Sequence, residues 1–200
     1  MSDAPENASR APLAHMAQQL AAGSSGAEGV VLTEARVSAL ANVRGNPADA
    51  GLLETIRDAL GFALPVTANT FTRSASRRCL WLGPDEWLFV CDQGEQKDTV
   101  VLLRDRLAGR HASVIDLGAA YAVLELRGAK APEVLAKACS LDFHPRAFRA
   151  GQCAQSNFAR TQAIVMLEHD VPLFRLFVQR SYAGYLAEWL LDAMREYRVA

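Results

Sequence analysis

One segment, residues 80–92, constrains the fold of this chain more than any other. It reads LWLGPDEWLFVCD, in which two apolar runs flank Gly-Pro-Asp-Glu, a pattern typical of a β-hairpin. A four-residue turn predicts three opposed pairs, which are Leu82 with Trp87, Trp81 with Leu88, and Leu80 with Phe89. Because side chains alternate along a strand, Leu80, Leu82, Trp87, Phe89 and Cys91 are expected on one face, and Cys79, Trp81, Leu88 and Val90 on the other.

Both predicted faces of this hairpin are apolar, so other parts of the structure must shield both faces from water. The chain's own helices are expected on one face. A second sheet or helix layer, or alternatively a partner subunit, is expected on the other. In this register Cys79 and Cys91 lie on opposite faces, so no disulfide is expected between them, although a bulge would change the register.

The turn itself contains two carboxylates, Asp85 and Glu86. One interpretation is a catalytic acid/base pair, and the other is a polar turn. Pro84 sets φ near −65°, which suits a turn, and aspartate is a common turn residue. A working acid/base pair needs carboxylates in different environments that converge on substrate, which neighbours at a tip rarely do. The turn interpretation is therefore favoured.

Outside the hairpin, helical periodicity alternates with strand pairs. Helices are expected over residues 47–60, 100–107, 132–139 and 182–193. Strands are expected over residues 37–43, 64–73, 113–117, 121–127, 153–159, 163–168 and 173–179. Helices that alternate with pairs of strands, rather than with single strands, predict an α+β fold with largely antiparallel sheet.

The N-terminal residues 1–29 are rich in Ala, Ser, Gly and Pro and are expected to form a flexible arm. Residues 13–22 are also compatible with a short helix, and the arm is either a loose tail or a segment that orders on a partner. The folded α+β domain is expected over residues 30–200.

Composition excludes several classes of function. The formal net charge is −1 and no basic stripe is present, so nucleic acid is not an expected partner. No apolar run reaches the roughly 18–20 residues of a membrane span, and the N-terminus lacks the apolar region of a secretory signal. The four cysteines, at 79, 91, 139 and 153, lack C-x-x-C spacing, so they are expected to be reduced core residues rather than zinc ligands.

Few other residues suggest chemistry. His144, next to Asp142 and Arg146, is compatible with an acid/base or anion site, but a His-Pro loop is more often structural. Arginines 160, 175 and 180 are expected in solvated or inter-subunit ion pairs, and the aromatic stripe of Tyr182, Tyr185 and Trp189 is expected in the core. No nucleotide-binding glycine motif and no G-x-S-x-G nucleophile setting is present.

Several stretches, in one order from about residue 30 to 197, resemble the gamma subunit of heterotetrameric sarcosine oxidase. They are LWLGPDEWLFV, AGRHASVIDL, LAKACSLDFHPRAF, GQCAQSNFAR, RSYAGYLAEWLLDAMREY and NVRGNPAD. The chain departs from the family pattern after Asp116, where Leu117-Gly118-Ala119-Ala120 replaces the expected polar residues.

The resemblance implies the folate-binding fold of aminomethyltransferases, the glycine-cleavage T-protein relatives. It also implies a cytoplasmic complex with alpha, beta and delta subunits that converts sarcosine to glycine, with formaldehyde or methylenetetrahydrofolate and hydrogen peroxide as products. In that family FAD, FMN, NAD and tetrahydrofolate belong to partner subunits, so no catalytic, cofactor-binding or metal-binding residue is expected here. The expected structural or interface residues are Trp81, Gly83, Pro84, Asp85, Trp87, His144, Arg146 and Trp189.

Two alternative functions are also compatible with the sequence. A free-standing folate-binding protein of one-carbon metabolism needs a carboxylate for the pterin ring and a cation for the glutamate tail, for which Asp116, Glu125 and Arg127 are the candidates. Alternation places Glu125 and Arg127 on one face. A general assembly factor is the other alternative.

Overall fold

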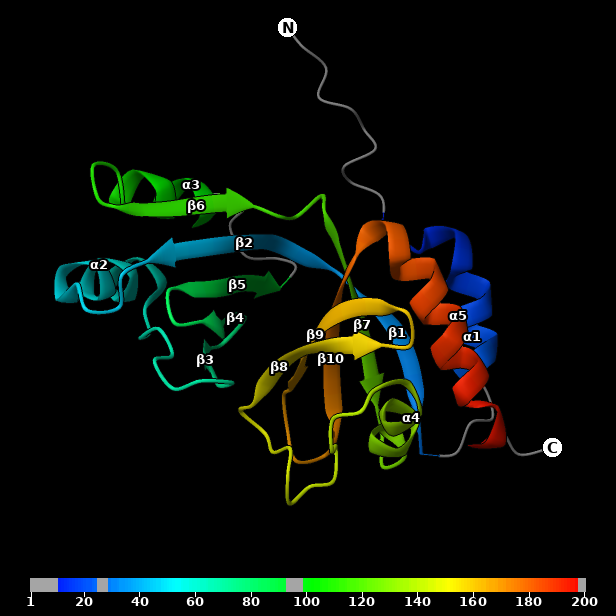
Figure 1. The fold of residues 1–200 in the computed structure, drawn as a ribbon. Coiled ribbons are helices and arrows are strands. Elements are labelled where there is room, and N and C mark those ends of the chain that lie inside the picture. Colours follow the sequence, from blue (N-terminus) through cyan, green and yellow to red (C-terminus); the bar gives the residue numbers. More distant parts are fainter. Residues whose placement is uncertain (1–10, 25–28, 93–98, 198–200) are drawn as a thin grey trace, which may run out of the picture. The chain divides into compact units, whose positions relative to one another are not determined.

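The computed structural model describes residues 11–24, 29–92 and 99–197 (Figure 1). The described residues divide into two compact units, the first formed by residues 11–24, 29–35, 119–150 and 155–197, and the second by residues 36–92, 99–118 and 151–154. Each unit has its own five-stranded sheet. Strand pairs alternate with helices along the chain, so the predicted α+β class is confirmed.

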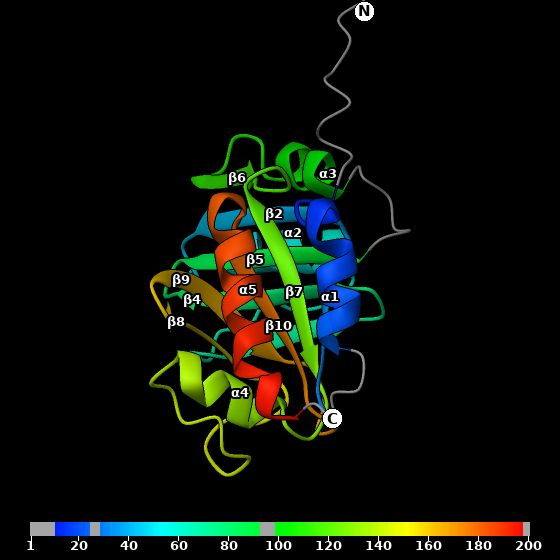
Figure 2. The ribbon, with the colours of Figure 1, turned by 90° about the vertical axis from the view of Figure 1, so that its right-hand side faces the viewer.

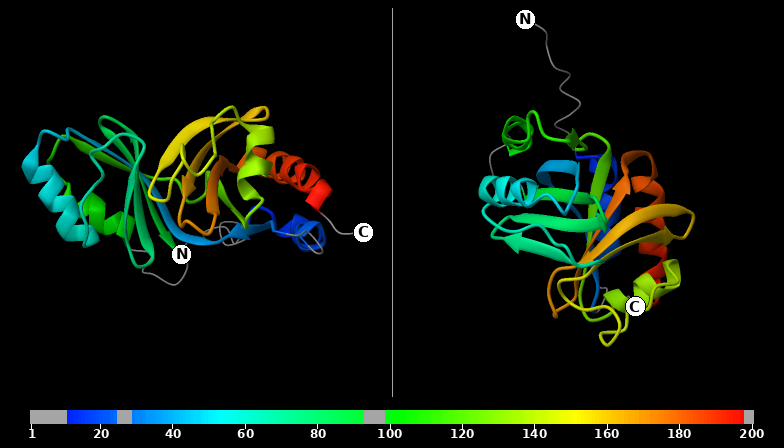
Figure 3. Two further views of the ribbon diagram at one scale, coloured as in Figure 1. Left: turned by 90° about the horizontal axis from the view of Figure 1, so that it is seen from below. Right: turned by 60° about the vertical axis from the view of Figure 1, so that its left-hand side comes forward.

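The second unit is built on an antiparallel sheet in the order β3-β4-β5-β2-β6. Its strands are Phe71–Ser74, Arg77–Gly83, Glu86–Asp92, Val37–Gly45 and Ala112–Asp116. Helices α2 (Ala50–Leu60) and α3 (Thr99–Arg106) pack together and cover one face of this sheet (Figures 1 and 3). The core between them contains Ala41, Val43, Leu52, Ile56, Trp87, Phe89, Val100 and Leu103.

Helix α2 begins later than the sequence suggests. The helix was expected from residue 47, but the Asn46 side chain accepts the N–H of Ala48 in a turn that precedes the helix. The N-cap is Asp49, whose carboxylate accepts the N–H of Leu52 at 3.0 Å. Gly61 follows the helix with a φ of 83°, because glycine adopts the left-handed conformation without a Cβ clash.

The first unit contains the sheet β1-β7-β10-β9-β8. Its strands are Val31–Ala35, Tyr121–Arg127, Leu173–Gln179, Thr161–Leu167 and Cys153–Phe158. Helices α1 (Ala17–Ser24) and α5 (Ala183–Ala193) lie side by side on one face, and α4 (Ala131–Ala138) packs against α5 (Figure 2). Short 3-10 turns cover Ala14–Met16, Arg180–Tyr182 and Arg195–Tyr197.

Part of residues 1–29, expected as a flexible arm, forms the short helix that the sequence also allowed. Residues 14–24 are helical, and Leu13, Met16 and Leu20 are buried. Packing of these apolar side chains against β1 and α5 outweighs the loop-like composition. Residues 1–10 and 25–28, which the predicted arm also included, lie outside the described residues.

Candidate functional site

The hairpin tip is a two-residue loop. Gly83 pairs with Glu86, and Pro84 and Asp85 form the exposed connection between β4 and β5. The backbone carbonyl of Asp85 accepts the N–H of Gly45 at 3.0 Å, which ties the tip to the neighbouring strand β2. The prediction that residues 83–86 form a turn is confirmed.

The two carboxylates of the tip do not act as a pair. Both oxygens of Glu86 are engaged by β2, since the amide of Asn42 donates to Oε1 at 2.7 Å and the guanidinium of Arg44 lies 2.7 Å from Oε2. Asp85 instead lines an open hollow of about 510 Å³. These contacts join β5 to β2 through the Glu86 side chain, so both of its oxygens are occupied and neither is positioned to transfer a proton.

The predicted strand register is wrong by one residue. Trp81 lies opposite Trp87, Leu80 opposite Leu88, and Cys79 opposite Phe89. The two-residue loop alone gives the expected pairs, but a β-bulge between Trp81 and Gly83 inserts one extra residue and shifts every pair beyond it. Cys79 and Trp81 therefore share the helix-covered face with Trp87, Phe89 and Cys91, contrary to the prediction.

Both faces of the hairpin are buried within this chain. On the face covered by helices, Trp87 has no exposed surface, and its indole N–H donates to the carbonyl of Pro65 at 2.8 Å. Trp81 is half-buried against the same core. On the other face, Leu80, Leu88 and Val90 are also fully buried. A partner subunit is therefore not needed to cover this hairpin.

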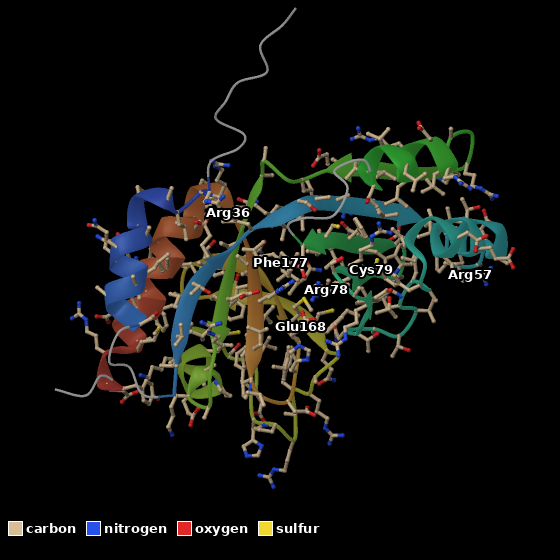
Figure 4. The ribbon with its side chains drawn as sticks, turned by 180° about the vertical axis from the view of Figure 1, so that it is seen from behind. Arg36, Arg57, Arg78, Cys79, Glu168 and Phe177 are labelled. Atoms are coloured by element: carbon tan, nitrogen blue, oxygen red, sulfur yellow. The ribbon has the colours of Figure 1, made fainter. Side chains whose placement is uncertain are left out.

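The cysteines are inert core residues, as predicted. All four are buried and none forms a disulfide. The thiol of Cys153 donates to the carbonyls of Thr70 and Trp81. Burial raises the pKa of Cys153 to about 12, and burial followed by the nearby Cys153 raises the pKa of Cys79 (labelled in Figure 4). Neither group supplies a thiolate near neutral pH.

This burial predicts the labelling behaviour of the folded chain. At pH 8, an alkylating or disulfide reagent is expected to modify none of the four thiols within minutes, because all four are buried and burial also raises the pKa of Cys79 and Cys153. In denaturant, all four are expected to react, as counted by mass spectrometry. Rapid modification of Cys79 or Cys153 in the native chain contradicts this burial.

The loop after α4 is a structural turn. The Asp142 carboxylate accepts the N–H of His144 at 2.9 Å, and Nδ1 of His144 accepts the backbone N–H of Arg146 at 3.1 Å. Phe143 and Phe148 on either side are buried, with both rings near Phe174. His144 and Arg146 remain exposed, so a role for them in an interface stays a prediction.

The aromatic stripe of α5 is not in the core as expected. Tyr182 is 48% exposed and Tyr185 is 38% exposed, while Trp189 is half-buried. The helix instead buries its opposite side, which carries Ala183, Leu186, Ala187 and Leu190. Small and aliphatic residues let the helix approach the sheet closely, which leaves the bulky tyrosines outside.

Sequence reasoning missed a buried ionic cluster on the sheet of the first unit. Nε of Arg175 on β10 lies 2.9 Å from a carboxylate oxygen of Glu125 on β7 and 4.0 Å from one of Glu168, which follows β9. Glu168 is labelled in Figure 4. The Arg175 and Glu168 side chains are only 10% and 1% exposed. Arg175 was expected in a solvated or inter-subunit pair, and the signal that could have corrected this is its position inside an apolar strand.

This cluster also bears on the set of residues considered for folate. The Glu125 carboxylate is engaged by Arg175, and Asp116, which belongs to the second unit, accepts the N–H of Gly118 at 2.8 Å. Glu125 and Arg127 do share one face of β7, as predicted from alternation. No residue of this set presents a carboxylate without a partner inside the chain.

Two hollows mark the surface. One, of about 510 Å³, lies at the hairpin tip and is lined by Arg44, Gly45, Asn46, Pro47, Asp85, His111, Ala112 and Ser113. The other, of about 420 Å³, lies on the first unit and is lined by uncharged side chains, among them Tyr121, Gln155, Asn157, Gln162, Phe177 and Gln179.

In the described part of the chain, no cluster of three or more His, Cys, Asp or Glu is arranged to hold a metal. None of the described helices is long and apolar enough to cross a membrane.

The arrangement of strand pairs and helices is the fold found in an aminomethyltransferase. The structure resembles glycine cleavage system aminomethyltransferase T from Bartonella henselae with a TM-score of 0.61 and 19% sequence identity. The alignment covers 88% of this chain and 49% of that chain. At this identity the similarity concerns the fold alone, and it confirms the predicted fold.

The chain belongs to the sarcosine oxidase gamma subunit family, whose model matches residues 44–196. Sarcosine oxidase subunit gamma of Arthrobacter sp. is 34% identical over 189 residues, which is 94% of this chain and 91% of the relative. A chain of heterotetrameric sarcosine oxidase from Corynebacterium sp. U-96 superposes with a TM-score of 0.87 at 30% identity, covering 96% of this chain and 97% of that chain. The predicted membership is confirmed.

Proposed function

We propose that this chain is a non-catalytic, structural subunit of a sarcosine oxidase complex. Its partners are the alpha, beta and delta subunits, and those chains hold FAD, FMN, NAD and tetrahydrofolate. The observation that carries the proposal is the similarity to gamma subunits over almost the whole length of both chains.

The geometry of the candidate groups supports a structural role. The carboxylates of Glu86 and Glu125 are bound by cations or amides of neighbouring strands. His144 accepts a backbone hydrogen bond within its own turn, and the thiols are buried. Glu86, Glu125, the His144 ring nitrogen and the thiols thus have structural contacts within the fold.

The test compares the isolated chain with the assembled complex. Expressed alone, the chain is expected to show no flavin absorbance and no oxidation of sarcosine. Co-expressed with the alpha, beta and delta subunits, it is expected to enter a four-chain complex. Stoichiometric flavin on the isolated chain overturns the proposal. Saturable quenching of tryptophan fluorescence by micromolar tetrahydrofolate favours a free-standing folate-binding protein instead.

The hairpin carboxylates provide a second test. The double substitution Asp85→Asn and Glu86→Gln keeps side-chain size and some hydrogen bonds but removes both charges. We expect turnover of the assembled enzyme to fall by less than about tenfold, whereas loss of a general acid or base costs about 10²–10⁴-fold. A variant complex that assembles normally and turns over about a thousandfold more slowly places the tip in an active site.

A further inference from the structure

Helix α5 carries its largest side chains on its outer side. Tyr182, at the N-cap, is followed by Tyr185 and Trp189 on the same side of the helix, because residues three and four apart are neighbours on a helix surface. The two tyrosines are 48% and 38% exposed, and the tryptophan is half-buried. The outer side of α5 faces the viewer in Figure 2, with α1 beside it. These three rings, the aromatic stripe of α5, therefore form one aromatic surface on the first unit.

The polar atoms of the stripe are not used inside the chain. Within the part that the structure describes, the hydroxyl groups of Tyr182 and Tyr185 and the indole N–H of Trp189 have no hydrogen-bond partner. The buried Trp87 differs, because its indole N–H donates to a backbone carbonyl at 2.8 Å. Exposed tyrosine and tryptophan side chains that keep a free polar end are typical of binding surfaces.

Glu188 adds a carboxylate to this surface. It is exposed, it follows Tyr185 by three residues, and it precedes Trp189 directly. Residues three apart on a helix have Cβ atoms about 5–6 Å apart, so the carboxylate lies beside the Tyr185 ring. Among residues 11–24, 29–92 and 99–197, no side chain or backbone group pairs with this carboxylate. The surface therefore combines three rings with one carboxylate that has no partner in the described chain.

The other charged side chains around α5 already have partners. Three ion pairs lie on α5, on the turn after it and on the neighbouring α4. They are Asp192–Arg195, Lys137–Glu196 and Lys130–Glu133. Arg180, two helical turns before Glu188, has contacts of its own within the chain, and α1 carries no charged side chain. No cation of the described chain is therefore left to neutralise Glu188, which favours a cation from outside.

The combination of rings and carboxylate indicates which cation fits. The faces of tryptophan and tyrosine rings attract cations, most often the guanidinium of arginine. A guanidinium is planar, so it stacks on a ring while its N–H groups donate to a carboxylate in the same plane. A lysine ammonium is a strongly hydrated point charge and does not stack. Tyr185 and Glu188, side by side, match the two demands of an arginine.

We infer that the aromatic stripe of α5 and Glu188 form the docking surface for an arginine-bearing segment of a partner subunit. The guanidinium stacks on the ring of Tyr185 and donates to the carboxylate of Glu188. Tyr182 and Trp189 pack around this contact and exclude water from it, as aromatic residues do at the centre of interfaces. The inference rests on the proposed function, because it takes the partner to be a subunit of the oxidase.

Hydroxyl-radical footprinting of the isolated chain and of the complex with the alpha, beta and delta subunits tests the inference. Oxidation of Tyr185 and Trp189, followed by mass spectrometry, is expected to slow by at least about fivefold on assembly, since rings at the centre of an interface lose contact with water. Unchanged oxidation in an intact complex overturns the docking surface but leaves the proposed function standing. Failure of the unaltered chain to enter any such complex overturns the proposed function itself.

Paired variants separate the docking surface from general surface effects. Tyr185→Ala removes the ring and Glu188→Lys opposes the arginine, and each is expected to weaken assembly by at least about tenfold. Both replacements are good helix formers, so the helix is kept. Tyr185→Phe keeps the ring and is expected to stay within about twofold of the original chain. The controls Val66→Ala and Glu54→Lys change exposed positions on the second unit and are expected to assemble normally. Equal behaviour of variants and controls contradicts the inference.

Two further outcomes identify a different occupant. Carbodiimide coupling joins a carboxylate to a lysine amine that it contacts, but not to an arginine. A cross-link from Glu188 to a lysine of a partner subunit therefore contradicts the assignment of an arginine. Concentration-dependent protection of Tyr185 in the isolated chain contradicts the assignment of a partner subunit, because a second copy then occupies the surface.

Discussion

Replacing Trp87 by alanine is expected to lower the free energy of unfolding of the isolated chain by about 3–5 kcal/mol, the range for deleting a fully buried aromatic side chain. Trp87 has no exposed surface and packs in the core between the sheet of the second unit and its helices. The substitution leaves a cavity there, and it also removes the donor that satisfies the carbonyl of Pro65. Since whole domains are stable by about 5–15 kcal/mol, much of the chain is expected to unfold or fail to assemble.

Denaturant unfolding followed by circular dichroism measures this loss. Trp87→Phe keeps most of the buried ring, removes the indole donor, and provides a measurable variant if the alanine variant does not fold. Its expected loss is about 1–3 kcal/mol, the cost of an unsatisfied buried acceptor. Trp189→Ala, at a half-buried position, is the control and is expected to cost less than Trp87→Ala. An unchanged midpoint for Trp87→Ala contradicts the core position of this residue.

Replacing Arg175 by methionine is expected to cost about 3–5 kcal/mol, as for other buried ion pairs that lose one partner. The change removes the guanidinium that lies between Glu125 and Glu168, while the Glu168 side chain stays 1% exposed. The loss comes mainly from the carboxylates left in a poorly solvated site, because methionine fills much of the arginine volume.

A matched set of variants distinguishes charge from packing at this site. Adding Glu168→Gln to Arg175→Met removes the less solvated of the two charges and is expected to recover about half or more of the lost stability, since a neutral amide costs less to bury than a carboxylate. Arg160→Met, at an exposed turn, is the control and is expected to stay within about 0.5 kcal/mol of the original chain. If the double variant is less stable than Arg175→Met alone, the charge explanation is wrong.

Much of the local structure could be predicted from the sequence. Helical periodicity located α2, α3, α4 and α5 to within a few residues, because apolar spacing reports which side of an element is buried. The turn at Pro84 and Asp85 was also predictable, since proline and aspartate determine their own backbone preferences. Five of the expected interface residues, Trp81, Gly83, Pro84, Asp85 and Trp87, lie in this hairpin, and their role at a subunit contact stays a prediction.

Other features depended on tertiary contacts. The bulge that shifts the hairpin register is a local irregularity with no distinct composition, so only the paired strands reveal it. Whether Tyr182 and Tyr185 face inward depends on how closely α5 approaches its sheet, and the helix at residues 17–24 depends on the apolar surface that receives it.

The sequence by itself determined the order and type of most elements, the conformation of the hairpin turn and the family to which the chain belongs, because each is encoded in neighbouring residues or in ordered motifs. Only the tertiary structure decided which charges are buried together and which distant residues meet at a sheet edge. Glu125, Glu168 and Arg175 meet because β7, β10 and β9 pair side by side. Gly151 and Cys153 bond to the backbone of Phe71 and Asn69, which lie about 80 residues earlier in the chain. Such contacts between residues distant in sequence arise from packing, which local propensities do not specify.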